Sequence, residues 1–210
     1  MFERFTESSR LTLFAARYEA TGLGGTAIEP EHMLLGLFRA DKGWLHHLFA
    51  VAGLSYSAAR NEIRAHWGPR PQIPVSEELP FSEQTERILR HAIDEADRFA
   101  EAYVSAGHML LGVLREEGSF AAEMLRAHGM TIDTVRERLR TPPAVAESGP
   151  DVADLGIRSV TGDPFNAIVA VERIRWSAEE LARSAAHVDE TRGSIEEIHL
   201  HLDALKQRLA

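Results

Sequence analysis

Two histidines, His32 and His108, begin identical pentapeptides, His-Met-Leu-Leu-Gly, that stand 76 positions apart. A pair of imidazoles can begin a zinc site, but such a site needs further nitrogen, sulfur or carboxylate ligands. The chain has no cysteine, and each histidine precedes an apolar run, so hydrogen bonding within the interior is the better interpretation. The remaining histidine pairs lack the three- or four-residue spacing of ligands on a helix, namely His46-His47 and His199/His201. We therefore expect no metal and no cofactor.

The motifs that usually mark catalysis are also missing. The sequence contains no Gly-x-x-x-x-Gly-Lys-Ser/Thr phosphate loop, no Gly-x-Gly-x-x-Gly turn and no Gly-x-Ser-x-Gly nucleophile elbow. Acidic pairs such as Glu116-Glu117 and Glu179-Glu180 are typical of solvated helix faces. We expect no enzymatic activity. A hydrolase hypothesis rests only on the presence of Ser, His and Asp, and inertness toward generic ester and peptide substrates would remove it.

Two hydroxyl residues stand at positions where a helix is expected to begin. Thr6 follows Phe5, and Ser82 follows Phe81. A hydroxyl at such a position caps the helix, and the free N–H groups of a helix N-terminus favour an anion such as phosphate or carboxylate. Capping alone would account for both residues, so an anion site needs other support.

The paired motifs belong to a long internal repeat with an offset of 76 residues. Phe5-Thr6-Glu7 aligns with Phe81-Ser82-Glu83, and Glu19-Ala20 aligns with Glu95-Ala96. Arg39 aligns with Arg115 and Gly53 with Gly129, and the alignment needs no insertion. A repeat of this length is a complete folding unit. The chain should therefore contain two similar units related by pseudo-twofold symmetry, with the function at the seam between them.

Each repeat has the pattern of four helices, and the predicted fold is all-α. Gly, Pro and Ser/Thr signals bound apolar residues at helical spacing, and no segment alternates long enough to predict a strand. Gly22, Gly24 and Gly25 should stop the first helix. Gly36 and Gly112, inside helices, indicate close helix approach. The predicted helices span about 6–21, from 30 through 38, 44–52, from 55 or 57 to 67, 82–100, 106–116, 120–128 and 131–140.

Prolines and apolar spacing define the remaining organisation. A double-repeat domain is predicted at 1–140, with repeats 5–68 and 81–140, followed by a linker at 141–164. Residues 165–210 read as an amphipathic helix or helical hairpin, because Ile195, Ile198, Leu202, Leu205 and Leu209 follow 3-4 spacing. This segment either folds back onto the domain or pairs with a second copy to form a homodimer.

Composition excludes several classes of partner. The net charge is −9, with only two lysines, Lys42 and Lys206, so a basic stripe for nucleic acid is not expected. No apolar run approaches the ~18 residues needed to cross a membrane, and the N-terminus does not resemble a signal peptide. We expect a cytoplasmic protein without nucleic-acid or membrane partners.

The doubled motif closely resembles the Clp N-terminal domain, the substrate- and adaptor-binding module at the front of ClpC- and ClpA-type AAA+ unfoldases. The resemblance rests on Phe5-Thr6-Glu7, Glu19-Ala20, Leu23-Gly24, Ile28 and Glu31–Leu37, and in the second copy on Asp94-Glu95-Ala96, Tyr103-Val104 and His108–Gly112. It covers about residues 1–140, and the opening six residues look especially like actinobacterial ClpC. It implies two four-helix repeats without catalysis.

The resemblance also implies binding residues. In some ClpC-type members, phosphorylated arginine is held by a first-helix hydroxyl and by an acidic residue before the paired histidine. Thr6 and Glu31 match this arrangement in the first repeat. In the second repeat Ser82 matches the hydroxyl, but Gly107 replaces the acidic residue. The resemblance therefore implies one phosphoarginine site and leaves the second in question.

In actinobacterial relatives the seam also takes cyclic peptide antibiotics. The matching residues are Phe2, Phe81 and Arg10, whereas Glu86 and Arg90 reverse the charges usual in the family. Together with Phe5, Thr6, Glu31 and Ser82, these residues form the predicted ligand surface.

The leading hypothesis is a non-enzymatic protein that binds peptides, degrons or adaptors. It would act as an accessory, decoy or sequestering factor for Clp proteolysis, with a ClpC-type unfoldase and peptide antibiotics as further candidate partners. The sequence continues into an amphipathic segment rather than Walker motifs, which predicts a free-standing relative of the recruitment domain. The alternative is a transcriptional regulator that uses the domain as a ligand sensor, which an electrophoretic mobility assay would test.

Overall fold

The computed structural model describes residues 2–40, 44–71, 73 and 79–141, together with the single positions 171 and 203. The chain divides into two compact units, Met1–Glu147 and Ser148–Ala210, and all described residues except 171 and 203 lie in the first. Most of the predicted linker and all but two residues of the predicted C-terminal helix lie outside the described residues. Their roles, including dimerisation, and the predicted domain boundaries remain predictions.

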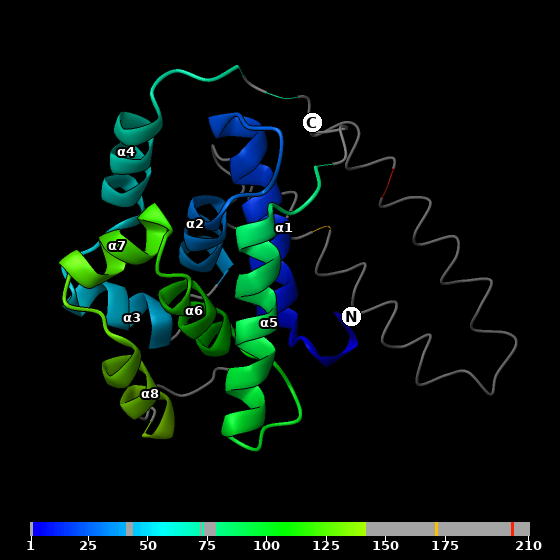
Figure 1. Ribbon diagram of the computed structural model, residues 1–210, viewed down its shortest axis with the longest axis vertical. Coiled ribbons are helices and arrows are strands. Elements are labelled where there is room, and N and C mark those ends of the chain that lie inside the picture. Colours follow the sequence, from blue (N-terminus) through cyan, green and yellow to red (C-terminus); the bar gives the residue numbers. More distant parts are fainter. Residues whose placement is uncertain are drawn as a thin grey trace, which may run out of the picture. The chain divides into compact units, whose positions relative to one another are not determined.

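The described part of the first unit is entirely helical, without any β-strand (Figure 1). A 3₁₀-helix at Phe2–Arg4 (η1) precedes the first repeat, which contains α1 (Glu7–Leu23), α2 (Pro30–Ala40), α3 (Trp44–Val51) and α4 (Tyr56–Trp67). The second repeat contains α5 (Glu83–Arg98), α6 (Ala106–Arg115), α7 (Phe120–Ala127) and α8 (Ile132–Arg140). The predicted all-α double repeat is confirmed.

The helices begin and end at the residues that the sequence signals select. Hydroxyl side chains accept a backbone N–H at the N-termini of several helices, as Thr6 does for α1 and Ser82 for α5. The predicted end of the first helix was wrong by two residues. Gly22 lies inside α1, and Gly24, with a φ of 83°, is the residue that ends it. Only glycine adopts that conformation without strain, which explains why the second glycine and not the first is the stop.

Each repeat is built on a close crossing of its first two helices. A Cβ atom on Gly36 of α2 would lie 2.4 Å from the carbonyl oxygen of Thr12 on α1. A Cβ atom on Gly112 of α6 would lie 2.4 Å from the carbonyl oxygen of Ile88 on α5. Both separations are far below a van der Waals contact. The predicted close approach at the two repeated glycines is confirmed.

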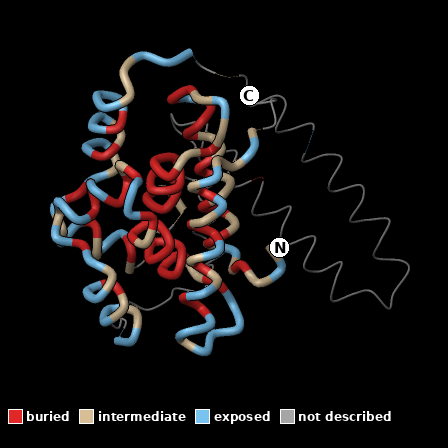
Figure 2. The backbone as a smooth tube through the Cα atoms, viewed as in Figure 1, coloured by how far each residue is buried: buried red, intermediate tan, exposed pale blue. Residues whose placement is uncertain are grey.

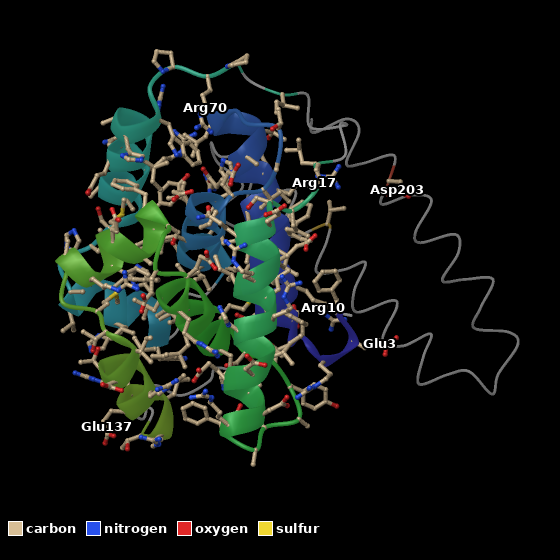
Figure 3. The ribbon with its side chains drawn as sticks, in the orientation of Figure 1. Glu3, Arg10, Arg17, Arg70, Glu137 and Asp203 are labelled. Carbon is tan, nitrogen blue, oxygen red and sulfur yellow. The ribbon has the colours of Figure 1, made fainter. Side chains whose placement is uncertain are left out.

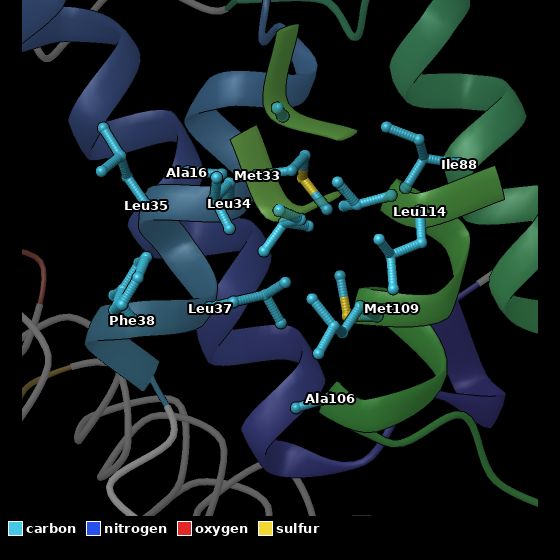
Figure 4. Close-up of a cluster of buried hydrophobic side chains, with 14 of the residues drawn as sticks. Ala16, Met33, Leu34, Leu35, Leu37, Phe38, Ile88, Ala106, Met109 and Leu114 are labelled. Carbon is cyan, nitrogen blue, oxygen red and sulfur yellow. The ribbon is translucent and has the colours of Figure 1, made fainter. Parts of the chain in front are cut away.

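The core lies around α2 and α6, which are buried between the other helices (Figure 2). Met33, Leu34 and Leu37 of α2 approach Met109 and Leu114 of α6 in one continuous apolar cluster (Figure 4). Helix α2 also contacts α5 and α7 of the second repeat. The two repeats therefore share a single core and fold as one body.

Short backbone pairings also join the repeats. Phe5 pairs with Val104, and Ile28 pairs with Phe81, each as an isolated parallel bridge. Thr6 N donates to Val104 O at 3.1 Å, and Ser82 N donates to Ile28 O at the same distance. The segment before the first helix of each repeat is thus held by the segment before the second helix of the other. This exchange fixes where α1 and α5 begin.

A repeated buried carboxylate completes the framework of each repeat. Glu19 is surrounded by Arg39, Tyr56 and Arg60, whose Nε lies 3.1 Å from Glu19 Oε2. Glu95 receives two hydrogen bonds from Arg136, at 2.7 and 2.9 Å, and one from Arg115 at 3.1 Å.

The sequence alignment pairs the glutamates and the first arginines, but it did not assign them a common role. The second arginines, Arg60 and Arg136, also occupy equivalent positions in the repeat. Charged residues that recur in both copies inside amphipathic helices are the signal that could have revealed these networks.

Candidate functional site

An aromatic cluster forms where the N-terminal segment meets the start of α5. The ring centroids of Phe2 and Phe5 lie 5.4 Å apart in an edge-to-face arrangement, and those of Phe2 and Phe81 lie 6.2 Å apart. Phe5 is buried, whereas Phe2 and Phe81 are partly exposed. The fold therefore brings three predicted residues together and leaves two of them partly exposed.

The two predicted hydroxyls already serve as helix caps. Thr6 Oγ1 accepts from Ser9 N at 3.3 Å and lies 3.0 Å from Ser9 Oγ. Ser82 Oγ accepts from Thr85 N at 3.2 Å. A ligand anion at either helix start would have to share these groups with the cap. Capping therefore accounts for both residues without a ligand.

Glu31 links the two repeats. Ala121 N, in the first turn of α7, donates to Glu31 Oε1 at 3.1 Å, and the residue is only 5% exposed. Burial raises the pKa of this carboxyl above its ordinary value, against the lowering effect of backbone hydrogen bonds. The structure gives no contact between Glu31 and Thr6, so the phosphoarginine pairing implied by the family stays a prediction.

The raised pKa leads to a test of this residue. The folded-state pKa of Glu31 lies above the unfolded value, so the charged form costs folding stability once pH rises through that interval. Glu31→Gln keeps an acceptor for Ala121 N and removes the charge. We expect the variant to gain up to about 1 kcal/mol relative to wild type at pH 7 and nothing below about pH 4, measured by urea unfolding at both pH values.

Glu123→Gln serves as the control for this experiment, because Glu123 is exposed in the first turn of α7, the helix whose N-terminus contacts Glu31. It should change stability by no more than about 0.5 kcal/mol at either pH. A loss of stability in Glu31→Gln at pH 7 would show that the ionised carboxylate is the better partner for α7.

The equivalent position in the second repeat is occupied differently. A Cβ atom on Gly107 would lie 2.7 Å from Cζ2 of Trp44 and 2.5 Å from Cδ2 of Leu139. The indole of Trp44, at the start of α3, therefore fills the space that a glutamate side chain would need. Gly107 thus leaves room for Trp44 of the first repeat and for Leu139 of its own repeat.

Besides Glu31, the predicted surface has three charged residues, which lie on α1 and α5. Arg10 is partly exposed on α1, near the N-terminal segment that carries Glu3 (Figure 3). Glu86 and Arg90 are exposed one turn apart on α5, with 3.8 Å between Glu86 Oε2 and Arg90 Nη1. Such an exposed pair contributes little to stability.

The paired histidines are structural, as the apolar runs beside them predicted. His32 Nδ1 accepts from Glu29 N at 2.9 Å, and His108 Nδ1 accepts from Ser105 N at 3.1 Å. Both rings are fully buried. Burial lowers the pKa of His32 to about 3 and also lowers that of His108, so both are neutral at physiological pH. Within the described segments, no three His, Asp or Glu residues gather as metal ligands.

A cleft lies apart from these predicted residues. It has a volume of about 640 Å³ between α3 and α8, where Leu48, Ala52 and Met130 contribute apolar surface and Val51 is 63% exposed. These residues could not be predicted from the sequence, because an apolar residue at helical spacing gives no sign of whether another element covers it. No helix in the described part of the chain is long and apolar enough to span a membrane.

Comparison with known proteins places this architecture in a family. The family model for the Clp repeat (R) N-terminal domain matches residues 4–128 and again residues 80–152. Negative regulator of genetic competence ClpC/MecB from Bacillus subtilis is 29% identical over 153 residues, covering 73% of this chain and 19% of the relative. The chloroplast chaperone protein ClpC1 from Oryza sativa subsp. japonica is 32% identical over 139 residues, covering 66% and 15%.

A solved structure agrees with these sequence matches. The N-terminal domain of the chaperone ClpD from Arabidopsis thaliana superposes with a TM-score of 0.54 at 25% identity, covering 67% of this chain and 97% of that structure. The chain belongs to the Clp repeat N-terminal domain family. In that family the domain binds substrates and adaptors and is not the catalytic part of the protein. The chain spans 19% and 15% of the length of the two curated relatives.

Proposed function

We propose that this protein binds peptide segments of substrates or adaptors at the surface formed by Phe2, Phe81 and Arg10. The observation that carries the proposal is the aromatic cluster at the meeting of the two repeats, where two phenyl rings remain partly exposed. Aromatic rings on a rigid framework are typical anchors for a peptide, because they offer large apolar area at low entropic cost. Membership of the family supports this class of ligand.

Alanine at Phe2 or Phe81 should weaken binding without unfolding the domain. Losing one aromatic anchor should raise the dissociation constant about 10- to 100-fold, measured by calorimetric titration with a cyclic peptide that targets ClpC. Circular dichroism should show unchanged helical content. The control is Val51→Ala, which removes exposed apolar surface from the separate cleft between α3 and α8. A loss of binding in Val51→Ala and not in the phenylalanine variants would move the peptide site to that cleft.

Phosphoarginine is the second ligand to titrate. Thr6, Ser82 and Glu31 already have partners within the fold, so the geometry favours the aromatic surface over a phosphoarginine site. Binding of phosphoarginine that disappears in Thr6→Ala and Glu31→Ala, with the cyclic peptide unaffected, would instead support the pairing that the family implies.

We further propose an accessory or sequestering role in Clp proteolysis, which rests on the same surface. The protein added to a degradation reaction driven by a ClpC-type unfoldase should slow the reaction by competing for substrate or adaptor. Phe81→Ala should restore the rate. For antibiotic sequestration, the protein should protect the unfoldase from a cyclic peptide in the same assay. An unchanged rate in both formats, despite measured peptide binding, would contradict this role.

A further inference from the structure

A second cleft, at the other end of α5, is lined by cations. It has a volume of about 500 Å³, and its walls are Arg98 and Phe99 at the end of α5 and Arg136 and Arg140 on α8. This size is in the range of small-ligand sites. Since α5 is 16 residues long, the cleft lies roughly 24 Å along the helix from the aromatic cluster, at 1.5 Å per residue.

The three arginines differ in whether their N–H groups already donate hydrogen bonds within the protein. Arg136 is held by the buried Glu95 through two hydrogen bonds and is fixed in place. Arg98 and Arg140 are 59% and 64% exposed, and their nearest carboxylate atoms lie 3.9 Å away in Glu95 and 3.8 Å away in Glu137. These distances exceed a hydrogen bond. Among the described residues, the guanidinium groups of Arg98 and Arg140 therefore make no hydrogen bond.

The cleft also has an aromatic wall. The guanidinium carbon of Arg140 lies 5.7 Å from the centroid of the Phe99 ring, and this ring lies 5.5 Å from the buried ring of His108. Phe99 thus packs against His108, is partly exposed and lines the cleft. A ligand that combines an oxyanion with an apolar group would satisfy both walls.

Comparison of the two repeats shows that the fold does not need this arrangement. In the first repeat the positions of Arg98 and Phe99 are occupied by Gly22 and Leu23. There Arg60, the counterpart of Arg136, closes the space, since its Nη2 lies 3.4 Å from the Cβ position of Gly22. The cationic and aromatic walls are therefore additions to a framework that folds without them.

Nearby negative charges do not cancel the positive charge of the arginines that line the cleft. Glu95 is fully buried and shared among Arg98, Arg115 and Arg136. Asp133 and Glu137, both on α8 and exposed, lie 3.9 Å from Arg136 and 3.8 Å from Arg140. Both line the cleft between α3 and α8 rather than this one, and Figure 3 labels Glu137. Helices α5 and α8 both end here, and their C-terminal partial charges are about half a unit each. Arg98 and Arg140 outweigh them.

We propose that this cleft binds an oxyanion next to an apolar group, as in an acidic side chain within a peptide. Arg98 and Arg140 supply the hydrogen bonds to the oxyanion, Arg136 supplies fixed positive charge, and Phe99 packs against the apolar neighbour. Charge-assisted hydrogen bonds from guanidinium groups are the strong kind. The proposal is independent of peptide binding at the aromatic cluster.

The test is a titration of the ¹⁵N-labelled full chain followed by NMR. The probes are the peptide acetyl-Leu-Glu-Glu-Leu-amide, its glutamine analogue and inorganic phosphate. We expect the glutamate peptide to shift the signals of residues 97–101 and 136–141 in a saturable way, and the glutamine peptide to shift them far less. The double variant Arg98→Gln/Arg140→Gln should weaken the glutamate peptide about tenfold or more.

Two control variants locate the effect. Arg138→Gln removes the same charge from α8 on the side of the other cleft, and Arg64→Gln removes it from the position in repeat 1 that matches Arg140. Neither should change the affinity by more than about twofold. Phe81→Ala should leave it unchanged, which separates this site from the aromatic cluster.

The probes also distinguish the source of the oxyanion. Phosphate that binds as tightly as the glutamate peptide would assign the cleft to free phosphate rather than to a peptide. Absence of saturable binding by either probe would overturn the proposal. Equal binding by the double variant and the wild type would overturn it as well.

Discussion

Replacing Gly36 or Gly112 by alanine is expected to destabilise the domain by about 2–4 kcal/mol, although alanine favours helices. The new methyl group would lie 2.4 Å from a backbone carbonyl oxygen of the neighbouring helix, which is Thr12 for Gly36 and Ile88 for Gly112. Backbone cannot rotate away as a side chain can, so the helices must separate and lose core contacts. The intrinsic helix preference of alanine, about 1 kcal/mol, offsets only part of this loss. Urea unfolding followed by circular dichroism measures the difference.

Gly118→Ala is the matched control for this substitution. No atom lies within 4 Å of the Cβ position of Gly118, and its φ is not in the left-handed region. Its stability should stay within about 0.5 kcal/mol of wild type or rise slightly, because alanine restricts the unfolded chain. Equal effects at Gly36 and Gly118 would contradict the close helix crossing.

Replacing Glu95 by glutamine should have an effect of similar size, about 2–4 kcal/mol at pH 7. Glu95 has 0% exposure and accepts hydrogen bonds from Arg115 and Arg136. Removing one partner from a buried ion pair leaves uncompensated charge. The loss is kept below the upper limit for such pairs because both arginines remain partly exposed to water.

The pH dependence of this effect has a defined sign. Burial alone would raise the pKa of Glu95, but the hydrogen bonds and charges of the arginines hold it below its ordinary value of 4.5. The stabilisation is therefore complete above pH 4.5 and is lost as pH falls toward the folded-state pKa. The difference between wild type and Glu95→Gln should shrink below pH 4.5.

Asp97→Asn is the control for this experiment, since its partner Arg4 and Asp97 itself are both exposed. It should cost no more than about 1 kcal/mol. A pH-independent loss in Glu95→Gln would show that lost packing, rather than charge, is responsible.

Much of the fold was predictable because the chain contains an internal repeat, so that each copy can be compared with the other. The repeated pentapeptides at His32 and His108 and the glycines inside them indicate two equivalent helix crossings, and both crossings are present. Ser, Thr and Gly at helix ends gave bounds within about two residues of those in the structure for α1 and for α3–α8, whereas the end of α2 and the helix η1 were not predicted. The structural role of the histidines also followed from the apolar runs beside them.

The parts that could not be predicted are those where the two repeats differ or where distant side chains meet. Nothing in the sequence connects Glu31 with the backbone of Ala121, 90 residues away. Likewise, the sequence predicts Arg98 and Arg140 as ordinary solvated charges, and only the fold shows that the ends of α5 and α8 line one cleft. Spacing along a helix predicts which face a residue occupies, but it does not predict which side chain arrives from the other repeat.

The contrast between Glu31 and Gly107 has a consequence for how such a domain can evolve and assemble. The first repeat carries the carboxylate of Glu31 and the indole of Trp44. The second provides an N–H, that of Ala121, which donates to the carboxylate, and a glycine, Gly107, which leaves room for the indole. Two copies of the first repeat would bring carboxylate against indole. Two copies of the second would place Phe120, the counterpart of Trp44, against Gly107 and would leave the amide of Ala121 without its carboxylate. The two halves are therefore complementary to each other at this seam, and a homodimer of either repeat would lose the hydrogen bond between Glu31 and Ala121 N or the packing of Trp44 on Gly107.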